Sequence, residues 1–550
     1  MDYKNTYDFW LNHPSIQEEI KEHLKNLSEE QIKECFYSDL EFGTAGMRGI
    51  IGIGTNRLNI YTIRKATLGY ANYLLKHVEN CKEKGVVIGH DNRHQSREFC
   101  IDCANLLSSK GIKVYIFDNL RPTPEISFAI RHLKASGGII ITASHNPKEY
   151  NGYKVYDETG CQLIDEKTDT LIKEIKQVDD IIAYSFSKNE NLIEVLDSNF
   201  DDIYYEEIKK LSLNTPYKKD FKIVYSPQHG AALNGVKKVL SDSGYNVHFV
   251  ESQCSFDPNF SNTLSANPED EKAYVECIKL ANKIDADLIL TSDPDGDRIG
   301  VGVKHKGNYV LLSGNQTGTL LLDYLLTYKK HSTKDFMAIA SVVTTSLIKT
   351  ISEKNNVFFK QTLTGFKYIG NVMTEYQDDK EFLFAVEESY GSALSPIVRD
   401  KDAIQAALII SEMSCLYHNQ NITLVDKLDE LHNKYGYCYD KVTNHKLDPL
   451  TGKEQIIKIM NYLRANIKDT IGDYKIKEIQ DYFKNIPGFP KSNLLKFIFE
   501  DDSFIAIRPS GTEPKYKIYY SIIEKDENKA LLKFNALQSE LNKIIAEQTL

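Results

Sequence analysis

Apolar and polar positions follow a strand–helix–strand order that occurs three times along the chain. Each copy begins with an apolar, β-branched run of strand length, and a polar loop then leads into a segment whose apolar residues have helical spacing. Two further strands complete each copy, and this alternation predicts parallel sheets with helices on their faces. The predicted first strands are 85–89, 221–225 and 336–342, the helices 96–109, 231–241 and 346–353, the second strands 112–117, 246–250 and 356–360, and the third strands 138–141, 287–290 and 382–386.

The two ends of the chain depart from this repeat. The first forty residues have helical spacing, and Ser28-x-x-Gln31 has the pattern of a capping box. Near the C-terminus, predicted strands at 503–507 and 515–522 flank a polar loop, which indicates a smaller α+β domain. The predicted fold class is therefore α/β, with three similar mixed α/β domains and a C-terminal α+β domain. The predicted domains are 1–205, 206–325, 326–445 and 446–550, with linkers at 188–191 and 448–453.

Length and composition agree with this organisation. At about 150 residues per domain, 550 residues correspond to roughly four domains. The chain is 41% apolar and 26% charged, which excludes disordered, collagen-like and disulfide-scaffold proteins. No apolar run approaches the roughly 18–20 residues of a membrane helix. The N-terminal residues contain no basic flank followed by an apolar segment, so we expect no secretory signal.

The nine cysteines are scattered, and their only close pair is Cys100-x-x-Cys103 in a predicted helix. With no second pair nearby, buried thiols are expected rather than a zinc or redox site, in a soluble cytoplasmic protein. The net charge is 67 − 77 = −10, which disfavours nucleic acid as a partner, and no membrane partner is expected either. An anionic ligand would need local cations, and candidates stand in or beside the polar loops: Arg48, Lys154, Arg298, Lys367, Lys401 and Arg508.

Ligands of parallel sheets bind beyond the carboxyl ends of the strands, where this chain carries distinctive polar loops. Asp293, Asp295 and Asp297 alternate within five residues, so their carboxylates would repel one another without a hard cation between them. An EF-hand is excluded because its sixth and twelfth positions would be Arg298 and Lys304. Three oxygen ligands leave coordination positions open, which favours Mg²⁺. An exposed acidic turn is the alternative.

Three other loops offer complementary chemistry. Ser144 lacks the glycines of a nucleophile elbow and alone would be a cap or turn residue, but beside a metal loop it could carry a phosphoryl group. The segment 508–512 combines a guanidinium, two hydroxyls and a glycine, which suits a phosphate site as well as a hairpin turn. Glu387 and Ser389 offer partners for sugar hydroxyls, although a solvated helix start is the alternative.

Seven motifs, taken together and in this order, resemble those of the α-D-phosphohexomutases, the family of phosphoglucomutases and phosphomannomutases. The insertion at 148–150 and Pro294 within the acidic loop are similar to the longer subgroup of type-2 phosphoglucomutases and phosphopentomutases. The resemblance implies four domains around a central active-site cleft, three of them sharing a core. The motifs are 42–49, 142–147 continuing into 151–154, 292–298, 364–367, 387–391, 400–402 and 508–514.

The resemblance also implies residue roles. Ser144 would be the phosphorylated residue and, through a phosphoserine oxygen, a ligand of one Mg²⁺ per chain together with Asp293, Asp295 and Asp297. The other catalytic residues implied are Arg48, His145, Lys154 and Lys401, and the general base stays open among the last three. Sugar and phosphate contacts are implied for Arg298, Thr364, Gly365, Glu387, Ser389, Arg508, Ser510, Gly511 and Thr512.

The implied activity is a phosphosugar mutase that acts on a small sugar phosphate. Phospho-Ser144 would convert glucose 1-phosphate to glucose 1,6-bisphosphate, which reorients and returns a phosphoryl group to the serine, leaving glucose 6-phosphate. The alternatives are a phosphopentomutase acting on ribose or deoxyribose phosphates, a phosphomannomutase, a phosphatase that uses Ser144, and a catalytically silent sugar-phosphate binder. The oligomeric state stays open between monomer and dimer.

Overall fold

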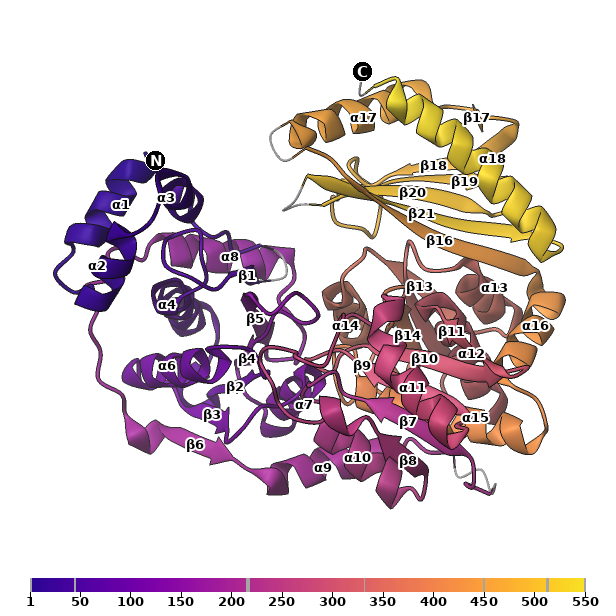
Figure 1. Ribbon diagram of the computed structural model, residues 1–550, viewed down its shortest axis with the longest axis horizontal. Helices are drawn as coiled ribbons and strands as arrows, with labels where there is room; N and C mark the ends of the chain where they lie inside the picture. The colour runs from indigo at the N-terminus through magenta and orange to yellow at the C-terminus, as the bar shows by residue number, and fades with distance from the viewer. Residues whose placement is uncertain are drawn as a thin grey trace. The chain divides into compact units, whose positions relative to one another are not determined.

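The computed structural model of the chain describes residues 2–43, 46–213, 218–330, 332–448, 451–510 and 514–548. Two compact units are present (Figure 1), and each is described by itself. The first unit comprises residues 1–313, 365–382 and 389–421, and the second comprises 314–364, 383–388 and 422–550.

The first unit begins with three helices, α1 (Tyr3–Asn12), α2 (Glu18–Lys25) and α3 (Glu29–Phe36). They pack around Trp10, Leu24 and Phe36. The capping box predicted at the start of α3 is confirmed, because the backbone N–H of Gln31 donates to Ser28 Oγ and that of Ser28 donates to Gln31 Oε1.

The first sheet has the strand order β1-β5-β4-β2-β3-β6. Strands β2, β3 and β4 are parallel and buried on both faces, which explains their uninterrupted apolar sequences, while β5 runs antiparallel to β4 and β1. The strands are β1 (Met47–Ile50), β2 (Val86–His90), β3 (Val114–Phe117), β4 (Gly137–Ile141), β5 (Tyr150–Asp157) and β6 (Ile193–Leu196).

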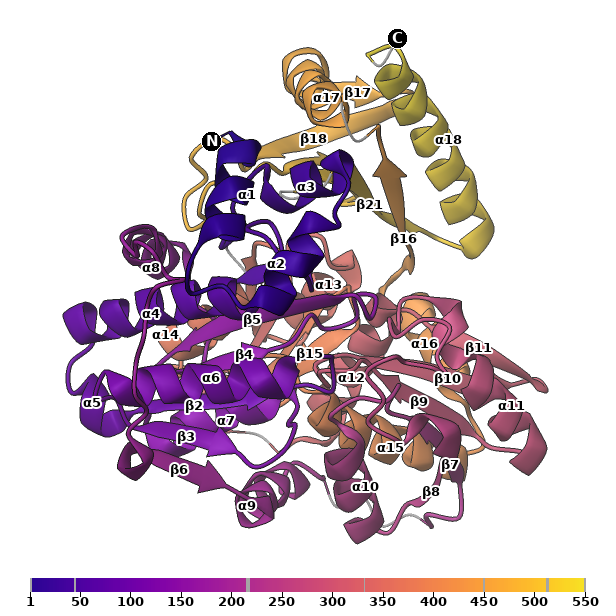
Figure 2. The ribbon, with the colours of Figure 1, turned by 60° about the vertical axis from the view of Figure 1, so that its left-hand side comes forward.

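Helices cover both faces of this sheet. Helices α4 and α6 lie side by side over one face (Figures 1 and 2), where they bury Val86, Ile88 and Ile139. Helix α7 packs closely on the other face, since a Cβ atom at Gly138 would lie 2.5 Å from Cδ1 of Ile130. The helices of this region are α4 (Ile60–His77), α5 (Cys81–Lys84), α6 (Ser96–Ser109), α7 (Thr123–Leu133), α8 (Asp165–Lys176) and the short 3₁₀ helix η1 (Glu190–Leu192).

The second sheet of this unit has the order β11-β10-β9-β7-β8, with β7 parallel to β8 and β9. Its strands are β7 (Lys222–Ser226), β8 (Asn246–Phe249), β9 (Leu288–Ser292), β10 (Ile299–His305) and β11 (Asn308–Leu312). The remaining elements of the unit are α9 (Ser198–Lys209), α10 (Leu233–Asp242), η2 (Glu251–Gln253), η3 (Glu271–Tyr274), α11 (Val275–Ile284), α14 (Phe366–Glu375), β15 (Gly391–Ala393) and α15 (Ala403–Asn419).

The second unit holds the core of the third α/β repeat. Its strands have the order β13-β12-β14, and β12 is parallel to β13. The elements are α12 (Gly314–Tyr328), β12 (Phe336–Ser341), α13 (Ser346–Lys354), β13 (Phe358–Thr362), most of β14 (Glu381–Glu387) and α16 (Leu424–Tyr435).

An antiparallel sheet follows in the same unit, with the order β16-β21-β20-β19-β18-β17. Helices α17 and α18 cover one face (Figure 1), and their apolar side chains form a core with those of the strands. The elements are β16 (Tyr437–Lys446), α17 (Gly452–Asn466), β17 (Thr470–Ile471), β18 (Tyr474–Asp481), β19 (Leu495–Phe499), β20 (Phe504–Pro509), β21 (Lys515–Glu524) and α18 (Glu527–Ala546).

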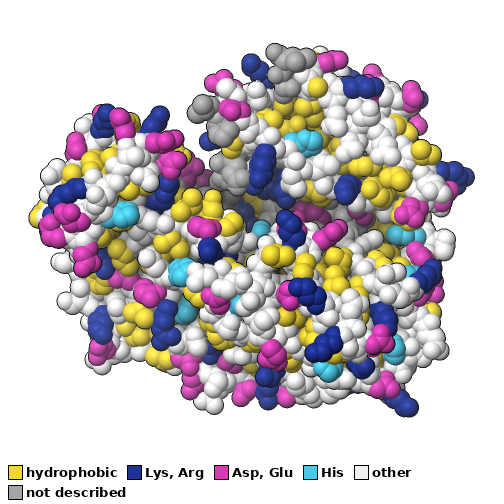
Figure 3. All heavy atoms as spheres, in the orientation of Figure 1, with side chains coloured by type: hydrophobic (Ala, Val, Ile, Leu, Met, Phe, Trp, Pro, Cys, Tyr) yellow, Lys and Arg dark blue, Asp and Glu magenta, His cyan; other side chains and the backbone are white. Residues whose placement is uncertain are grey.

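The predicted fold class is confirmed: three strand–helix–strand cores precede a C-terminal α+β region. The domain boundaries and the central cleft stay predictions. All nine cysteines are free thiols and eight are buried, as expected. Within the described residues, none of the helices combines the length and the apolar character needed to cross a membrane. On the face drawn in Figure 3, acidic and basic side chains are interspersed.

Candidate active site

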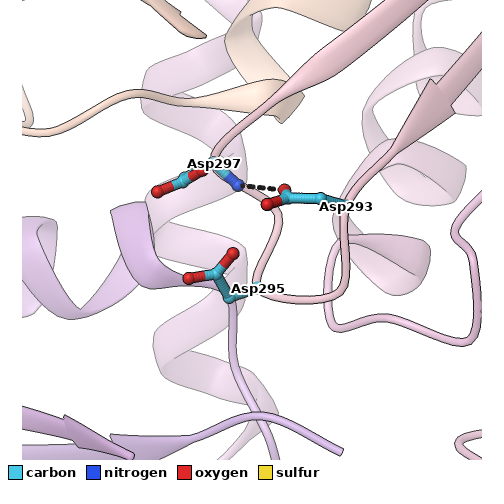
Figure 4. Close-up of side chains that lie close together, drawn as sticks. All are labelled: Asp293, Asp295 and Asp297. Carbon is cyan, nitrogen blue, oxygen red and sulfur yellow. Dashed lines mark hydrogen bonds between the residues drawn. The ribbon is translucent and has the colours of Figure 1, made fainter. Parts of the chain in front are cut away.

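The three aspartates predicted to bind a metal lie together in the loop after β9. Their carboxylates gather at one side of the loop (Figure 4), and one oxygen of each lies within 4.8 Å of the others. The loop is closed by the backbone N–H groups of Asp297 and Arg298, which donate to Asp293 Oδ1 at 3.1 and 3.0 Å. Asp293 and Asp295 are fully buried and Asp297 is 3% exposed.

Two carboxylate oxygens of this cluster accept no hydrogen bond within the described part of the chain. Among the described residues, Asp295 Oδ1 and Asp297 Oδ1 are buried without a hydrogen-bond partner. Burial, with the neighbouring charges of Asp295 and Asp297, raises the pKa of Asp293 well above its usual value. An all-oxygen, anionic donor set of this kind fits a hard divalent cation such as Mg²⁺.

Ser144 comes from the loop after β4 and reaches the same cluster. Its Oγ donates to Asp293 Oδ2 at 2.8 Å and lies 3.3 Å from Nδ1 of His145. The backbone of Ser144 is left-handed, with φ at +51°, and its N–H donates to Thr142 Oγ1 at 2.9 Å. The predicted proximity of the serine and the acidic loop is therefore present, although no sequence pattern indicated the left-handed backbone.

Two buried lysines neutralise the aspartates. Nζ of Lys154, on β5, lies 2.9 Å from Asp295 Oδ2, and Nζ of Lys401 lies 3.1 Å from Asp297 Oδ2. Burial alone would raise the pKa of Asp295, but the adjacent Lys154 ammonium brings that pKa below its usual value. The stem of Lys401 passes over Gly391, where a Cβ atom would lie 2.0 Å from the lysine Cδ, so a larger residue there would displace the ammonium.

Three further predicted residues of the first unit lie close to this cluster. Arg48 donates to Asn146 Oδ1 at 2.9 Å, which connects β1 to the Ser144 loop, and Arg298 donates to Glu269 Oε1 at 2.6 Å. Burial lowers the pKa of His145 well below its usual value, and the nearby cations Arg298 and Arg48 lower it further. His145 is therefore neutral at neutral pH. Ser389 and Gly365 also belong to this unit, and Gly365 precedes α14 with φ at +120°.

The remaining predicted residues belong to the second unit. Glu387 is buried at the end of β14, and Thr364 lies two residues beyond β13 with its hydroxyl oxygen buried. Arg508 and Ser510 are half-buried on the hairpin of β20 and β21, where the Ser510 N–H donates to the carbonyl of Lys515 at 2.8 Å. Gly511 and Thr512 lie outside the described residues.

Sequence reasoning missed two residues that support the cluster. Thr123, at the start of α7, donates through its hydroxyl to Asp295 Oδ2 at 3.0 Å and through its N–H to the Asp295 carbonyl at 2.8 Å. Arg93, in the loop after β2, contacts the backbone of the Ser144 loop. For Arg93 a signal was available, since polar residues at the carboxyl end of a parallel strand are candidates by position alone.

Comparison with known proteins identifies the family. Three models match along the chain: Phosphoglucomutase/phosphomannomutase alpha/beta/alpha domain I over residues 39–181, domain II over 202–307 and domain III over 313–435. The phosphoglucomutase of Staphylococcus aureus strain MRSA252 is 38% identical over 534 residues, which cover 94% of this chain and 96% of that protein. The chain belongs to the phosphoglucomutase/phosphomannomutase family.

Solved structures of two phosphoglucomutase relatives share the fold. A phosphoglucomutase/phosphomannomutase family protein of Burkholderia thailandensis matches with a TM-score of 0.68 and 18% identity, over 92% of this chain and 96% of that one. The open form of parafusin, a phosphoglucomutase from Paramecium, matches with a TM-score of 0.69 and 20% identity, over 92% of this chain and 95% of that one. As a member of this family, the protein is an isomerase with phosphohexose mutase activity, and the resemblance found in its motifs is confirmed.

Proposed function

We propose that this phosphohexose mutase interconverts glucose 1-phosphate and glucose 6-phosphate by moving a phosphoryl group to and from Ser144. The supporting observation is the position of Ser144 Oγ, buried beside the three aspartates and 2.8 Å from Asp293 Oδ2. The choice of glucose is supported by the 38% identity to a protein named phosphoglucomutase along nearly the whole chain.

Asp293, Asp295 and Asp297, together with a phosphoserine oxygen on Ser144, would hold one Mg²⁺ ion. The buried Oδ1 atoms of Asp295 and Asp297, which accept no hydrogen bond from the described residues, support this assignment. When bound, the ion would offset negative charge on the oxygens of the transferring phosphoryl group.

The residues around the cluster would position and neutralise the reacting groups. In the forward transfer, the bond between phosphorus and Ser144 Oγ breaks as a bond forms to a free sugar hydroxyl. The hydroxyl proton would pass to neutral His145, or to Lys154 or Lys401 after that lysine has first lost its own proton. The product is glucose 1,6-bisphosphate, which reorients so that its other phosphoryl group returns to the serine. Arg48 and Arg298 would bind phosphoryl or sugar oxygens during both transfers.

Recognition of the sugar phosphate is assigned to the remaining predicted residues. Arg508 and Ser510 offer a guanidinium and a hydroxyl for the phosphate that is not being transferred, and Gly511 and Thr512, which follow in the sequence, would bind the same phosphate. Sugar hydroxyls would be bound by residues of two further loops: Thr364 and Gly365 in one, Glu387 and Ser389 in the other.

The serine is tested by Ser144→Ala, which removes the only atom that could carry the phosphoryl group in this scheme. Mutase turnover should fall at least ~10⁴-fold, since no covalent route remains, while the melting temperature stays near that of the parent. The control is Ser136→Ala, because Ser136 is also buried and precedes the same strand β4. Activity of Ser144→Ala close to that of the control would refute the proposal.

Two measurements define the ligand and the reaction. Incubation with glucose 1,6-bisphosphate should add one phosphoryl mass to the peptide that contains Ser144. The ratio of kcat/KM for glucose 1-phosphate to that for ribose 1-phosphate should be well above one, because discrimination between substrates is expressed in that ratio. A preference for the pentose would identify a phosphopentomutase, and steady release of inorganic phosphate would identify a phosphatase.

A further inference from the structure

Arg93 binds the backbone of the loop that carries Ser144 at several points. Its guanidinium donates to three backbone carbonyls of the loop, those of Ser144 at 2.6 Å, Asn146 at 2.5 Å and Pro147 at 2.8 Å, and to the carbonyl of Tyr150, the first residue of β5, at 2.9 Å. Because Arg93 follows β2 and Ser144 follows the neighbouring strand β4, both residues lie at the same edge of the first sheet.

The Ser144 loop has little support of its own. Residues 144–149 lie outside the helices and strands, and the backbone bonds within the loop join Asn146 N–H to the carbonyl of Ala143 and Tyr150 N–H to that of Pro147. The left-handed backbone of Ser144 adds strain, because the Cβ atom of a residue other than glycine disfavours this conformation. A conformation of this kind persists only where the surroundings impose it.

Arg93 is itself firmly placed. Its side chain is fully buried, as is that of Asp91, whose carboxylate Oδ2 lies 3.2 Å from the arginine Nε. The other oxygen of Asp91 accepts from the Arg93 N–H at 2.9 Å and from Ser96 Oγ at 2.8 Å. The guanidinium also lies over the ring of Phe260, 5.2 Å from its centroid. The charge is thus compensated and the plane of the guanidinium is fixed.

We propose that Arg93 is a positioning residue that fixes the Ser144 loop, and with it the serine hydroxyl, for phosphoryl transfer. The proposal rests on the function proposed for Ser144. The side chain acts through backbone carbonyls and touches no reacting atom, so its contribution is to the geometry of the nucleophile. A lysine could keep the charge but cannot reproduce four bonds from one planar group.

The first measurement is hydrogen exchange of the loop amides in the enzyme without substrate. In Arg93→Lys, exchange of the Asn146 and Tyr150 amides should become at least ~10-fold faster, because the carbonyls that organise the loop lose their common donor. The matched control is Arg64→Lys, since Arg64 is also paired in the first unit, with both bonds to Asp102 at 2.8 Å, but stands on α4. The control should leave exchange in the loop unchanged.

The second measurement separates kcat from KM for glucose 1-phosphate. Displacement of a reacting group by about 1 Å can cost ~100-fold in rate, so Arg93→Lys should lower kcat by ~10- to 100-fold. KM should change by less than about threefold, because the groups assigned to substrate binding are untouched. A general loss of structure would instead lower the melting temperature and the fraction of active enzyme.

The outcomes distinguish this proposal from the function on which it rests. Parental exchange of the loop in Arg93→Lys overturns the role of Arg93 even if Ser144→Ala abolishes turnover, and so does faster exchange with parental kcat. If Arg93→Lys does not fold, Asp91→Asn replaces it, because that variant removes the carboxylate that fixes the guanidinium. Faster exchange with lowered kcat in Asp91→Asn supports the proposal, and parental values of both overturn it.

Discussion

The candidate site residues of the two units differ in how many elements of the fold hold them in place. In the first unit, the buried aspartates receive contacts from Lys154 on β5, Lys401 before α15 and Thr123 on α7, which lie far apart along the chain. In the second unit, Arg508 and Ser510 stand half-buried on a single hairpin of β20 and β21. Groups that make and break bonds need fixed geometry, whereas a phosphate anchor needs charge and donors on a stable edge.

Among the substitutions that test this difference between the two units, we expect the largest effect, a rise in KM, at Arg508. Arg508→Gln removes a charged donor, and such bonds contribute about 1.5–3 kcal/mol, so KM for glucose 1-phosphate should rise by roughly 10- to 150-fold. The fall in kcat should be smaller, because the role proposed for Arg508 is to bind the phosphate that does not react. Steady-state kinetics measure both parameters.

The control for Arg508 is its cross-strand neighbour. Lys517 faces Arg508 in the register of β20 and β21, is also half-buried and carries the same charge. Lys517→Gln should leave KM within about twofold of the parent, as surface substitutions usually do. Equal KM values for the two variants would contradict the proposed role of Arg508 in binding the phosphate.

A smaller effect is expected at Thr123, which supports the aspartates of the first unit. Thr123→Val keeps the shape of the side chain but leaves Asp295 Oδ2 without a hydroxyl donor. One hydrogen bond to a charged group, of about 1.5 kcal/mol, corresponds to a roughly 10-fold weaker affinity for Mg²⁺. Calorimetric titration of the enzyme with Mg²⁺ checks this directly.

Two variants test the specificity of that effect. Thr123→Ser retains the hydroxyl and should restore the affinity for Mg²⁺. Thr168→Val removes another buried threonine hydroxyl, one that donates to carbonyls near the start of α8, and should leave the affinity unchanged. Equal losses in Thr123→Val and Thr168→Val would mean that Thr123 has only a general structural role.

The smallest effect that we expect is on the pH dependence of stability in the second unit. Lys496 is buried on β19, where its ammonium donates to the carbonyl of Val342 at 2.7 Å. Burial, reinforced by the charge of Lys349 and opposed by that of Glu478, lowers the pKa of Lys496 to about 7. In the unfolded chain that pKa is near 10.4, so the folded state binds fewer protons between pH 7 and pH 10.

Stability should therefore rise with pH over this window because of Lys496. Lys496→Met should be more stable than the parent at pH 7, and the gap should shrink by on the order of 5 °C in melting temperature by pH 9.5. Scanning calorimetry at several pH values measures the gap. Lys477→Met is the control, since Lys477 is exposed on β18, and a constant gap for both variants would contradict the assignment.

The sequence predicted the fold class well because each repeat has strong local signals. The helix at 96–109 was placed correctly to both ends, and Gly111 and Gly244 follow their helices with left-handed backbones, as expected of C-terminal caps. The strand predicted at 112–117 begins two residues later, since the N–H of Ile112 still donates to the carbonyl of Leu107 in the helix and that of Lys113 donates to the carbonyl of Lys82. Element ends depend on tertiary hydrogen bonds, which the local pattern does not contain.

The sequence predicted those residues of the candidate site whose side-chain type and spacing indicate a chemical role. The alternating aspartates and Ser144 lie at strand ends, and the rule for parallel sheets brings them together. Arg93 and Thr123 escaped because their partners are 51 to 172 positions away, and those of Arg93 are backbone carbonyls. Any residue type can supply a carbonyl, so the contacts of Arg93 leave no pattern in a single sequence, and only its position at the carboxyl end of β2 made it a candidate.

The lysines beside the aspartates also bear on how the proposed Mg²⁺ ion would bind. Two ammonium groups already offset part of the negative charge of the three carboxylates from within the protein. An ion bound there would share Asp295 and Asp297 with Lys154 and Lys401, so its affinity would be set by competition between the ion and these internal charges.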